Sequence, residues 1–159
     1  MGIRCTLIAR SSRGEERRLR LDKAWDALEV LLTGGRGVAG GIGDAVTGKG
    51  GTACPPLGAY GPSKRLSASR VEVIARSLAS IDEETLRARV PLLSELDVHG
   101  SFGGATEVDP AIAQLLREEG FDDETDAEEI AWLLELVERL AGFYREAHEE
   151  GEEVIVSIG

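Results

Sequence analysis

Hydrophobic and polar residues alternate near both ends of the chain. From Ile3 to Ala9 every second residue is small or apolar, and residues 153–158 repeat this alternation. A period of two is typical of a β-strand with one buried face. We therefore predict a strand in each segment and expect both strands to share one sheet.

The first helical pattern lies in Leu21–Gly34, a segment that ends on the glycine expected of a helix terminus. Trp25 and three leucines fall on one side of a 3.6-residue helix, so this side should be buried in the core. Asp22 is expected as the N-cap or as a first-turn acid. Asp26 and Glu29 are expected to point away from the core.

Apolar residues at helical spacing recur further along the chain. Ser, Thr and Asp residues ahead of these segments are typical N-caps, and glycines follow two of them. Four more helices are predicted: from Ser67 or Ser69 through Leu78, from Ser80 or Asp82 to Val90, over 109–120, and over 125–150.

The segments between these elements lack a clear hydrophobic period. Residues 11–20 are polar and rich in arginine, which favours a solvated loop or a lead-in to the first helix. Residues 35–61 are rich in glycine and are predicted to form one long loop, and 97–106 a second. Strands at the ends and helices between them predict an α+β fold, in which the whole chain, 1–159, is one domain of helices packed on a small sheet.

Two nucleotide-binding motifs match the glycine-rich segment in letters only. Residues 35–40 satisfy GxGxxG, but a helix is predicted before them where the dinucleotide motif needs a strand. Residues 43–49 satisfy GxxxxGK, but Gly50 follows where a P-loop needs a hydroxyl for magnesium. We interpret both matches as coincidental and predict no cofactor.

Charge is distributed unevenly along the chain. The formal net charge is −11, yet residues 1–23 carry seven basic and three acidic side chains, while 107–153 carry three basic and seventeen acidic ones. Such acidity repels phosphate backbones, which argues against nucleic-acid binding. Acidic faces promote solubility, and some of them dock basic protein partners.

The remaining composition argues against several other classes. Two cysteines outside any CxxC pattern indicate a reducing cytoplasm, with Cys5 expected in a strand and Cys54 in a loop. No apolar run is as long as a membrane span. The only histidines, His99 and His148, are too few for a predicted zinc site, and no group of catalytic residues stands out.

Several short motifs, taken in order, resemble the YfbM-like family of small bacterial proteins. The resemblance extends over nearly the whole chain and implies an α+β bacterial domain of unknown function. The motifs that show this resemblance are Met1-Gly2-Ile3, Leu21-Asp22-Lys23-Ala24-Trp25, Leu31-Leu32-Thr33-Gly34, Tyr60-Gly61-Pro62, Leu66-Ser67 and Phe143-Tyr144.

The chain also departs from this family pattern. Family members often carry histidines where this helix has Asp26 and Glu29, and they often carry an aromatic segment near 98–104. The stretch between the first strand and the first helix is shortened here. No role of those family histidines or aromatic residues is therefore carried over to this chain.

Two functions remain open at this stage. The first is a non-catalytic interaction domain whose acidic face, between Asp109 and Glu153, binds a basic protein, with neutralisation of a toxin as one form of it. The alternative is a small-molecule binder or enzyme with a site under the glycine-rich loop, lined by Trp25, Asp26, Tyr60 and His99. The oligomeric state is not predicted.

Overall fold

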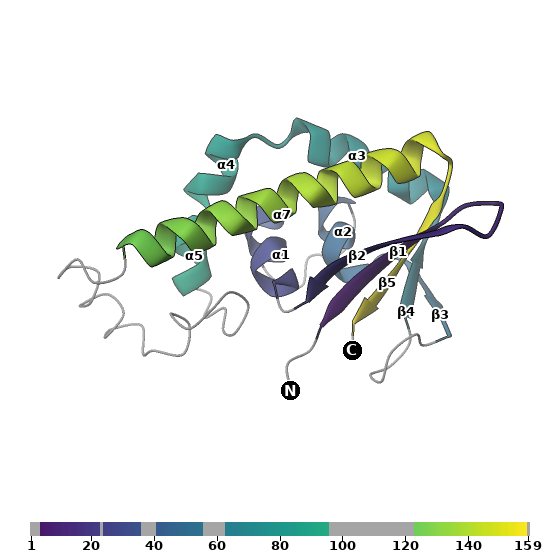
Figure 1. Cartoon of the computed structure of the whole chain (residues 1–159), viewed down its shortest axis with the longest axis horizontal. Helices are drawn as coiled ribbons and strands as arrows, with labels where there is room; N and C mark the ends of the chain where they lie inside the picture. The colour runs from purple at the N-terminus through teal and green to yellow at the C-terminus, as the bar shows by residue number, and fades with distance from the viewer. Residues whose placement is uncertain (1–3, 23, 36–40, 56–62, 96–122, 159) are drawn as a thin grey trace.

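The sheet is antiparallel and has five strands. The computed structural model describes residues 4–22, 24–35, 41–55, 63–95 and 123–158. The strand order is β2-β1-β5-β4-β3, so the predicted first and last strands are confirmed as neighbours, with β5 in the centre. The strands are β1 (Cys5–Arg10), β2 (Glu16–Asp22), β3 (Thr52–Cys54), β4 (Ser63–Leu66) and β5 (Glu153–Ile158) (Figure 1).

The helices pack on one face of this sheet. In Figure 1 the long helix α7 runs along the other helices. Leu7 and Val156 belong to the same buried cluster as Leu28 of α1 and Leu140 of α7, which confirms the α+β fold. The helical elements are α1 (Trp25–Thr33), η1 (Gly41–Gly43), α2 (Asp44–Thr47), α3 (Ala68–Ser80), α4 (Glu83–Ala88), α5 (Val90–Glu95) and α7 (Asp123–Glu149).

Side-chain caps fix the starts of α3 and α4. The Ser67 hydroxyl accepts a hydrogen bond from the amide of Arg70, and the Asp82 carboxylate accepts one from the amide of Thr85. Hydrogen bonds from the side chain and from the amide of Thr85 lower the pKa of Asp82 below its ordinary value. As predicted, the buried face of α3 consists of Val71, Ile74, Ala75 and Leu78.

The predicted loop at residues 11–20 is wrong over its second half, because Glu16–Asp22 form the edge strand β2. Its alternation is visible in Leu19 and Leu21, but charged residues occupy the other positions, as is typical of an edge strand. Asp22 is not the cap of α1, since it ends β2 with a φ of 47°. The N-cap position belongs to Ala24, which makes no side-chain hydrogen bond there.

The predicted single loop over 35–61 is also wrong where the structure describes it. It contains the turn η1, the helix α2 and the edge strand β3, and Cys54 is therefore a strand residue. Elements of three or four residues are too short to show a hydrophobic period, which is why the pattern missed them.

The long helix is confirmed as α7, and Gly151 follows it with a φ of 65°. Pro91 does not end a helix; it lies in the first turn of α5, where its missing amide donor is tolerated. The predicted loop at 97–106 and helix at 109–120 lie outside the described residues.

Candidate functional site

One polar side of α1 carries two of the four predicted ligand-binding residues. Trp25 and Asp26 are half-buried, while Glu29 is only 3% exposed, so the prediction that Glu29 points away from the core is wrong. The spacing of three and four residues brings Glu29 beside both of them on the helix surface. A buried carboxylate on this helix is a feature that the periodicity alone did not indicate.

Tyr60 and His99, the other two predicted ligand-binding residues, lie outside the described residues. Whether they converge with Trp25 and Asp26 therefore stays a prediction, as does the small-molecule site that they would form. At the opposite end of α1, the guanidinium of Arg89 donates to the carbonyls of Leu31 at 2.9 Å and Leu32 at 2.6 Å. A cation on these carbonyls stabilises the negative end of the helix.

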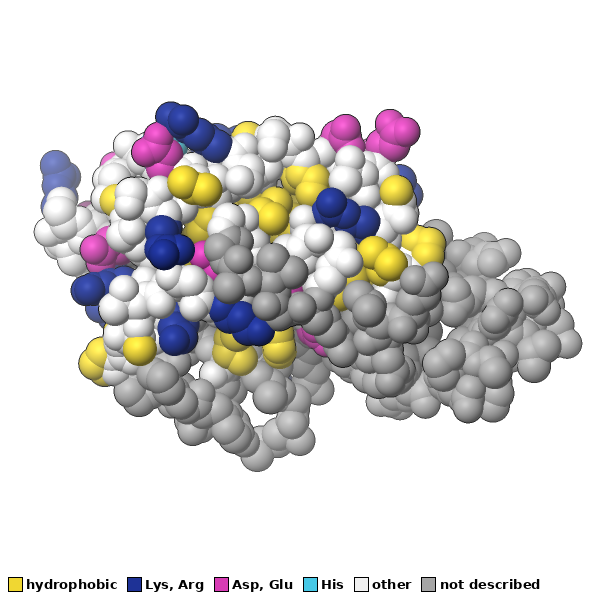
Figure 2. All heavy atoms as spheres, turned by 180° about the vertical axis from the view of Figure 1, so that it is seen from behind, with side chains coloured by type: hydrophobic (Ala, Val, Ile, Leu, Met, Phe, Trp, Pro, Cys, Tyr) yellow, Lys and Arg dark blue, Asp and Glu magenta, His cyan; other side chains and the backbone are white. Residues whose placement is uncertain are grey.

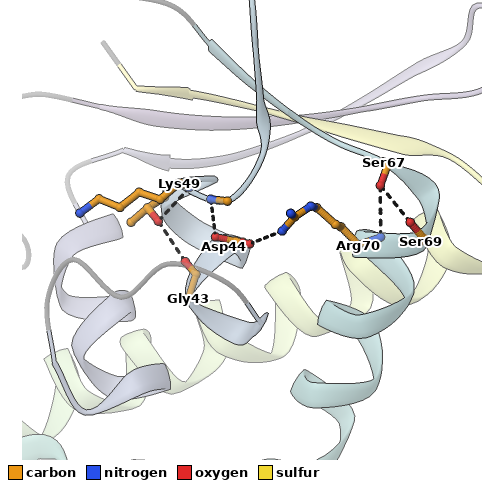
Figure 3. A network of polar contacts seen from close by, with 8 residues as sticks. Gly43, Asp44, Lys49, Ser67, Ser69 and Arg70 are labelled. Atoms are coloured by element: carbon orange, nitrogen blue, oxygen red, sulfur yellow. Dashed lines mark hydrogen bonds and ion pairs between the residues drawn. The ribbon is translucent and has the colours of Figure 1, made fainter.

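A second buried carboxylate, Asp44, begins the short helix α2 and is 1% exposed. It accepts a hydrogen bond from the amide of Gly50 at 2.8 Å, and the Arg70 guanidinium lies 3.3 Å from its other oxygen. Figure 3 shows the Arg70 side chain extending from α3 towards Asp44. The charge of Asp44 is therefore balanced from α3, and the oxygen that accepts from Gly50 holds the turn that follows α2.

Two further side chains bind the backbone of α2 from distant elements. The hydroxyl of Tyr144 on α7 donates to the Ala45 carbonyl at 2.7 Å, and the Cys5 thiol on β1 donates to the Val46 carbonyl at 3.4 Å. Burial raises the pKa of Tyr144 well above its ordinary value, and the nearby Cys5 and Asp44 add to this effect. Tyr144 is therefore a neutral structural donor that joins α7 to α2.

The glycines at the end of the false P-loop motif and directly after it have packing roles. A Cβ atom on Gly50 would lie 2.5 Å from a carboxylate oxygen of Asp44, and one on Gly51 would lie 2.8 Å from the Arg65 carbonyl oxygen. Gly48 has a φ of 63° and approaches Val156 closely. The side chain of Lys49 points away from Asp44 in Figure 3. Residues 44–47 form a helix packed on the sheet, so this segment serves the fold and is not arranged around a phosphate.

The two cysteines should differ strongly in reactivity. Burial raises the pKa of the Cys5 thiol to about 12, so it stays protonated in the native protein, whereas Cys54 is partly accessible. At about pH 8.5, the ordinary thiol pKa, iodoacetamide should modify Cys54 and leave Cys5 intact. Mass spectrometry of the Cys54→Ser variant checks this: no adduct should form until urea is added. Equal rates at both thiols in the native protein would contradict the burial of Cys5.

The exposed side of α7 forms the most distinctive surface among the described residues. Trp132 is 44% exposed there, although tryptophan is usually buried. Trp132 falls between the apolar positions on the core side of α7, and no role was predicted for it from the sequence. We call this surface the acidic face of α7 and define it by the exposed residues Glu128, Trp132, Glu135, Glu138, Arg139, Arg145, Glu146 and Glu149.

Charges on the acidic face are only partly paired. Arg139 binds Glu135 at 2.8 Å, and Glu146 binds Arg17 of β2. Glu129 is half-buried and does not belong to this face. On the side of the molecule opposite to the view of Figure 1, lysine and arginine side chains gather mainly over the half that contains the sheet (Figure 2).

Comparison with known proteins agrees with this fold. The model of a family described as "Domain of unknown function (DUF1877)" matches residues 6–157, so the chain belongs to this family. A solved structure, the protein of unknown function YfbM from Escherichia coli, aligns with 98% of this chain and 99% of its own, with a TM-score of 0.65 and 18% identity. At that identity the similarity shows the fold alone. A search of the curated proteins found no match.

Two features are absent from the described ranges. No three His, Cys, Asp or Glu side chains are grouped there as a metal ion would require. None of the helices in the same ranges is both long enough and apolar enough to cross a membrane.

Proposed function

We propose that this protein is a non-catalytic interaction domain that binds a basic protein partner through the acidic face of α7. The exposed Trp132 carries this proposal. Tryptophan is the residue type most enriched at binding hot spots, because it offers a large apolar area with a polar N–H. On α7 it is surrounded by glutamates at helical spacing, as in an interface with a hydrophobic centre and a polar rim.

The charge of the surroundings supports a basic partner. The glutamates of the acidic face outnumber its two arginines, and Glu150 and Glu153 extend the negative surface past the end of α7. Such a field accelerates the approach of a positively charged surface and disfavours acidic competitors. Neutralisation of a basic toxin is one form that this activity would take.

Capture from native lysate tests the proposal with three immobilised baits. The wild type and Val73→Ala should retain the same basic proteins, whereas Trp132→Ala should lose them by at least tenfold. Val73, on α3, is the matched control because it is the other large hydrophobic side chain exposed among the described residues. Retention should fall when the salt is raised, since the contacts are partly ionic.

Both variants should keep the melting temperature of the wild type within a few degrees, because exposed side chains contribute little to stability. Identical sets of captured proteins on all three baits would contradict a role for Trp132. Retention of acidic proteins alone would contradict a basic partner.

A further inference from the structure

We propose that the outer edge of β2 binds an extended acidic segment of another protein, which adds to the sheet as a sixth strand. In the described part of the chain β2 pairs with β1 alone, so its other edge is not covered by a strand. With seven residues it is the longest strand of the sheet. An edge strand of this kind presents backbone donors and acceptors that an added strand pairs with directly.

Side chains along β2 point alternately to the two faces of the sheet. Arg17 and Leu19 face the helices, since Arg17 reaches Glu146 on α7 and Leu19 packs against the core. Arg18 and Arg20 project from the opposite face of the sheet and are exposed. An incoming strand would therefore meet Arg18 and Arg20 in the middle of one face, with the acidic Glu16 and Asp22 at its two ends, and Leu19 in the middle of the other face.

Arg18 and Arg20 are exposed, although Ile8 and Ile155 on the same face of the sheet are buried, and both arginines have capacity for further acidic contacts. Arg18 pairs with Glu16 at 3.3 Å, but that carboxylate is shared with Arg10 at 3.1 Å. Arg20 makes no ion pair with any described residue and lies across from Thr6 of β1. Directly opposed charges of opposite sign stabilise a strand pair by about 0.2–1 kcal/mol each.

The same pattern disfavours a second copy of this chain as the occupant. An antiparallel β2–β2 pair that used all seven residues would be centred on Leu19 and would place Arg18 opposite Arg20. Like charges in that position destabilise the pair. A segment of alternating polar and apolar residues fits both faces when it has carboxylates beside Arg18 and Arg20, an apolar side chain beside Leu19, and uncharged polar residues beside Glu16 and Asp22.

The location of the edge also favours a local acidic ligand in spite of the overall net charge of −11. Residues 1–23, which include the β1–β2 hairpin, carry seven basic and three acidic side chains. In Figure 1 the turn of this hairpin projects beyond the end of α7. The basic edge therefore lies within reach of a partner, and the screening length of about 8 Å at physiological salt limits repulsion from distant acids.

Fluorescence anisotropy with a labelled peptide as long as β2 tests this proposal. Valine alternates in it with polar residues, which are glutamates opposite Arg18 and Arg20 and threonines opposite Glu16 and Asp22. The wild type should bind the peptide, and the double variant Arg18→Glu/Arg20→Glu should bind it at least tenfold more weakly. The matched control, Arg76→Glu/Arg87→Glu, changes the net charge equally on two exposed helical arginines and should bind as the wild type does. A peptide N-methylated at alternate residues should lose binding, because it cannot complete the backbone ladder.

Equal binding of the N-methylated peptide would overturn strand addition. Equal binding by the Arg18→Glu/Arg20→Glu variant would overturn recognition of acidic side chains, and absence of binding to the wild type would overturn the whole proposal. Trp132→Ala should leave peptide binding unchanged. The test of strand addition at β2 can therefore fail without contradicting the proposed role of the acidic face of α7, and the reverse also holds.

Discussion

Replacement of Arg17 by methionine should lower the free energy of unfolding by about 2–3 kcal/mol, one of the two largest effects that we expect from a single substitution. Arg17 binds Glu146 and donates to Glu152 at 2.7 Å, and its guanidinium carbon lies 5.5 Å from the centre of the Phe143 ring. Glu152 is only 3% exposed, so the variant leaves a buried carboxylate without its ion-pair partner. Urea denaturation followed by circular dichroism measures the effect.

The double variant Arg17→Met/Glu152→Leu should recover more than half of this loss, because an apolar pair replaces the orphaned charge. Arg18→Met is the control: Arg18 pairs with Glu16 in solvent, and its loss should change the free energy of unfolding by less than about 1 kcal/mol. If the Arg17→Met and Arg18→Met variants were equally stable, the ion pair between Arg17 and Glu152 would make no measurable contribution to the free energy of unfolding.

Gly51→Ala should destabilise the protein by a similar amount, about 2–3 kcal/mol. Its Cβ atom would lie 2.8 Å from the Arg65 carbonyl oxygen and 3.0 Å from the Gly48 carbonyl oxygen. Both are backbone atoms, so no side chain can rotate away, and the turn must separate from β4. The midpoint of urea unfolding should therefore shift to a lower concentration.

Gly142→Ala on α7 provides the matched control for this substitution. The nearest side-chain atom to its Cβ would be 3.9 Å away, on Arg145, and alanine favours the helix over glycine by up to about 1 kcal/mol. This variant should be as stable as the wild type or slightly more stable. A Gly51→Ala protein as stable as Gly142→Ala would show that the turn after α2 accommodates a Cβ atom at residue 51 without strain.

Most of the regular elements were predictable because their buried residues repeat over several turns or pairs. The stripe of α3, with Val71 and Ile74, and the alternation of β5 required no tertiary information. The edge strand β2 was missed because its exposed positions are arginines that a loop would also tolerate, although Leu19 and Leu21 kept the period of two.

The candidate sites were harder to predict than the elements that carry them. Burial of Glu29 and Asp44 depends on contacts between segments, since a charged residue on an amphipathic helix is normally placed in solvent. The exposure of Trp132 follows from the rotation of α7 on the core, and its size alone would predict burial. The glycines at 48–51 suggested flexibility, whereas their neighbours show that they permit close backbone packing.

The central position of β5 determines when the sheet can be completed during synthesis. Until residues 153–158 leave the ribosome, the β1–β2 and β3–β4 hairpins have no strand to join them. Pairing of β1 with β5 then closes a loop of most of the chain, a nonlocal contact that slows folding. The nascent protein therefore exposes unpaired strand edges, a feature that promotes aggregation, until residues 153–158 are made.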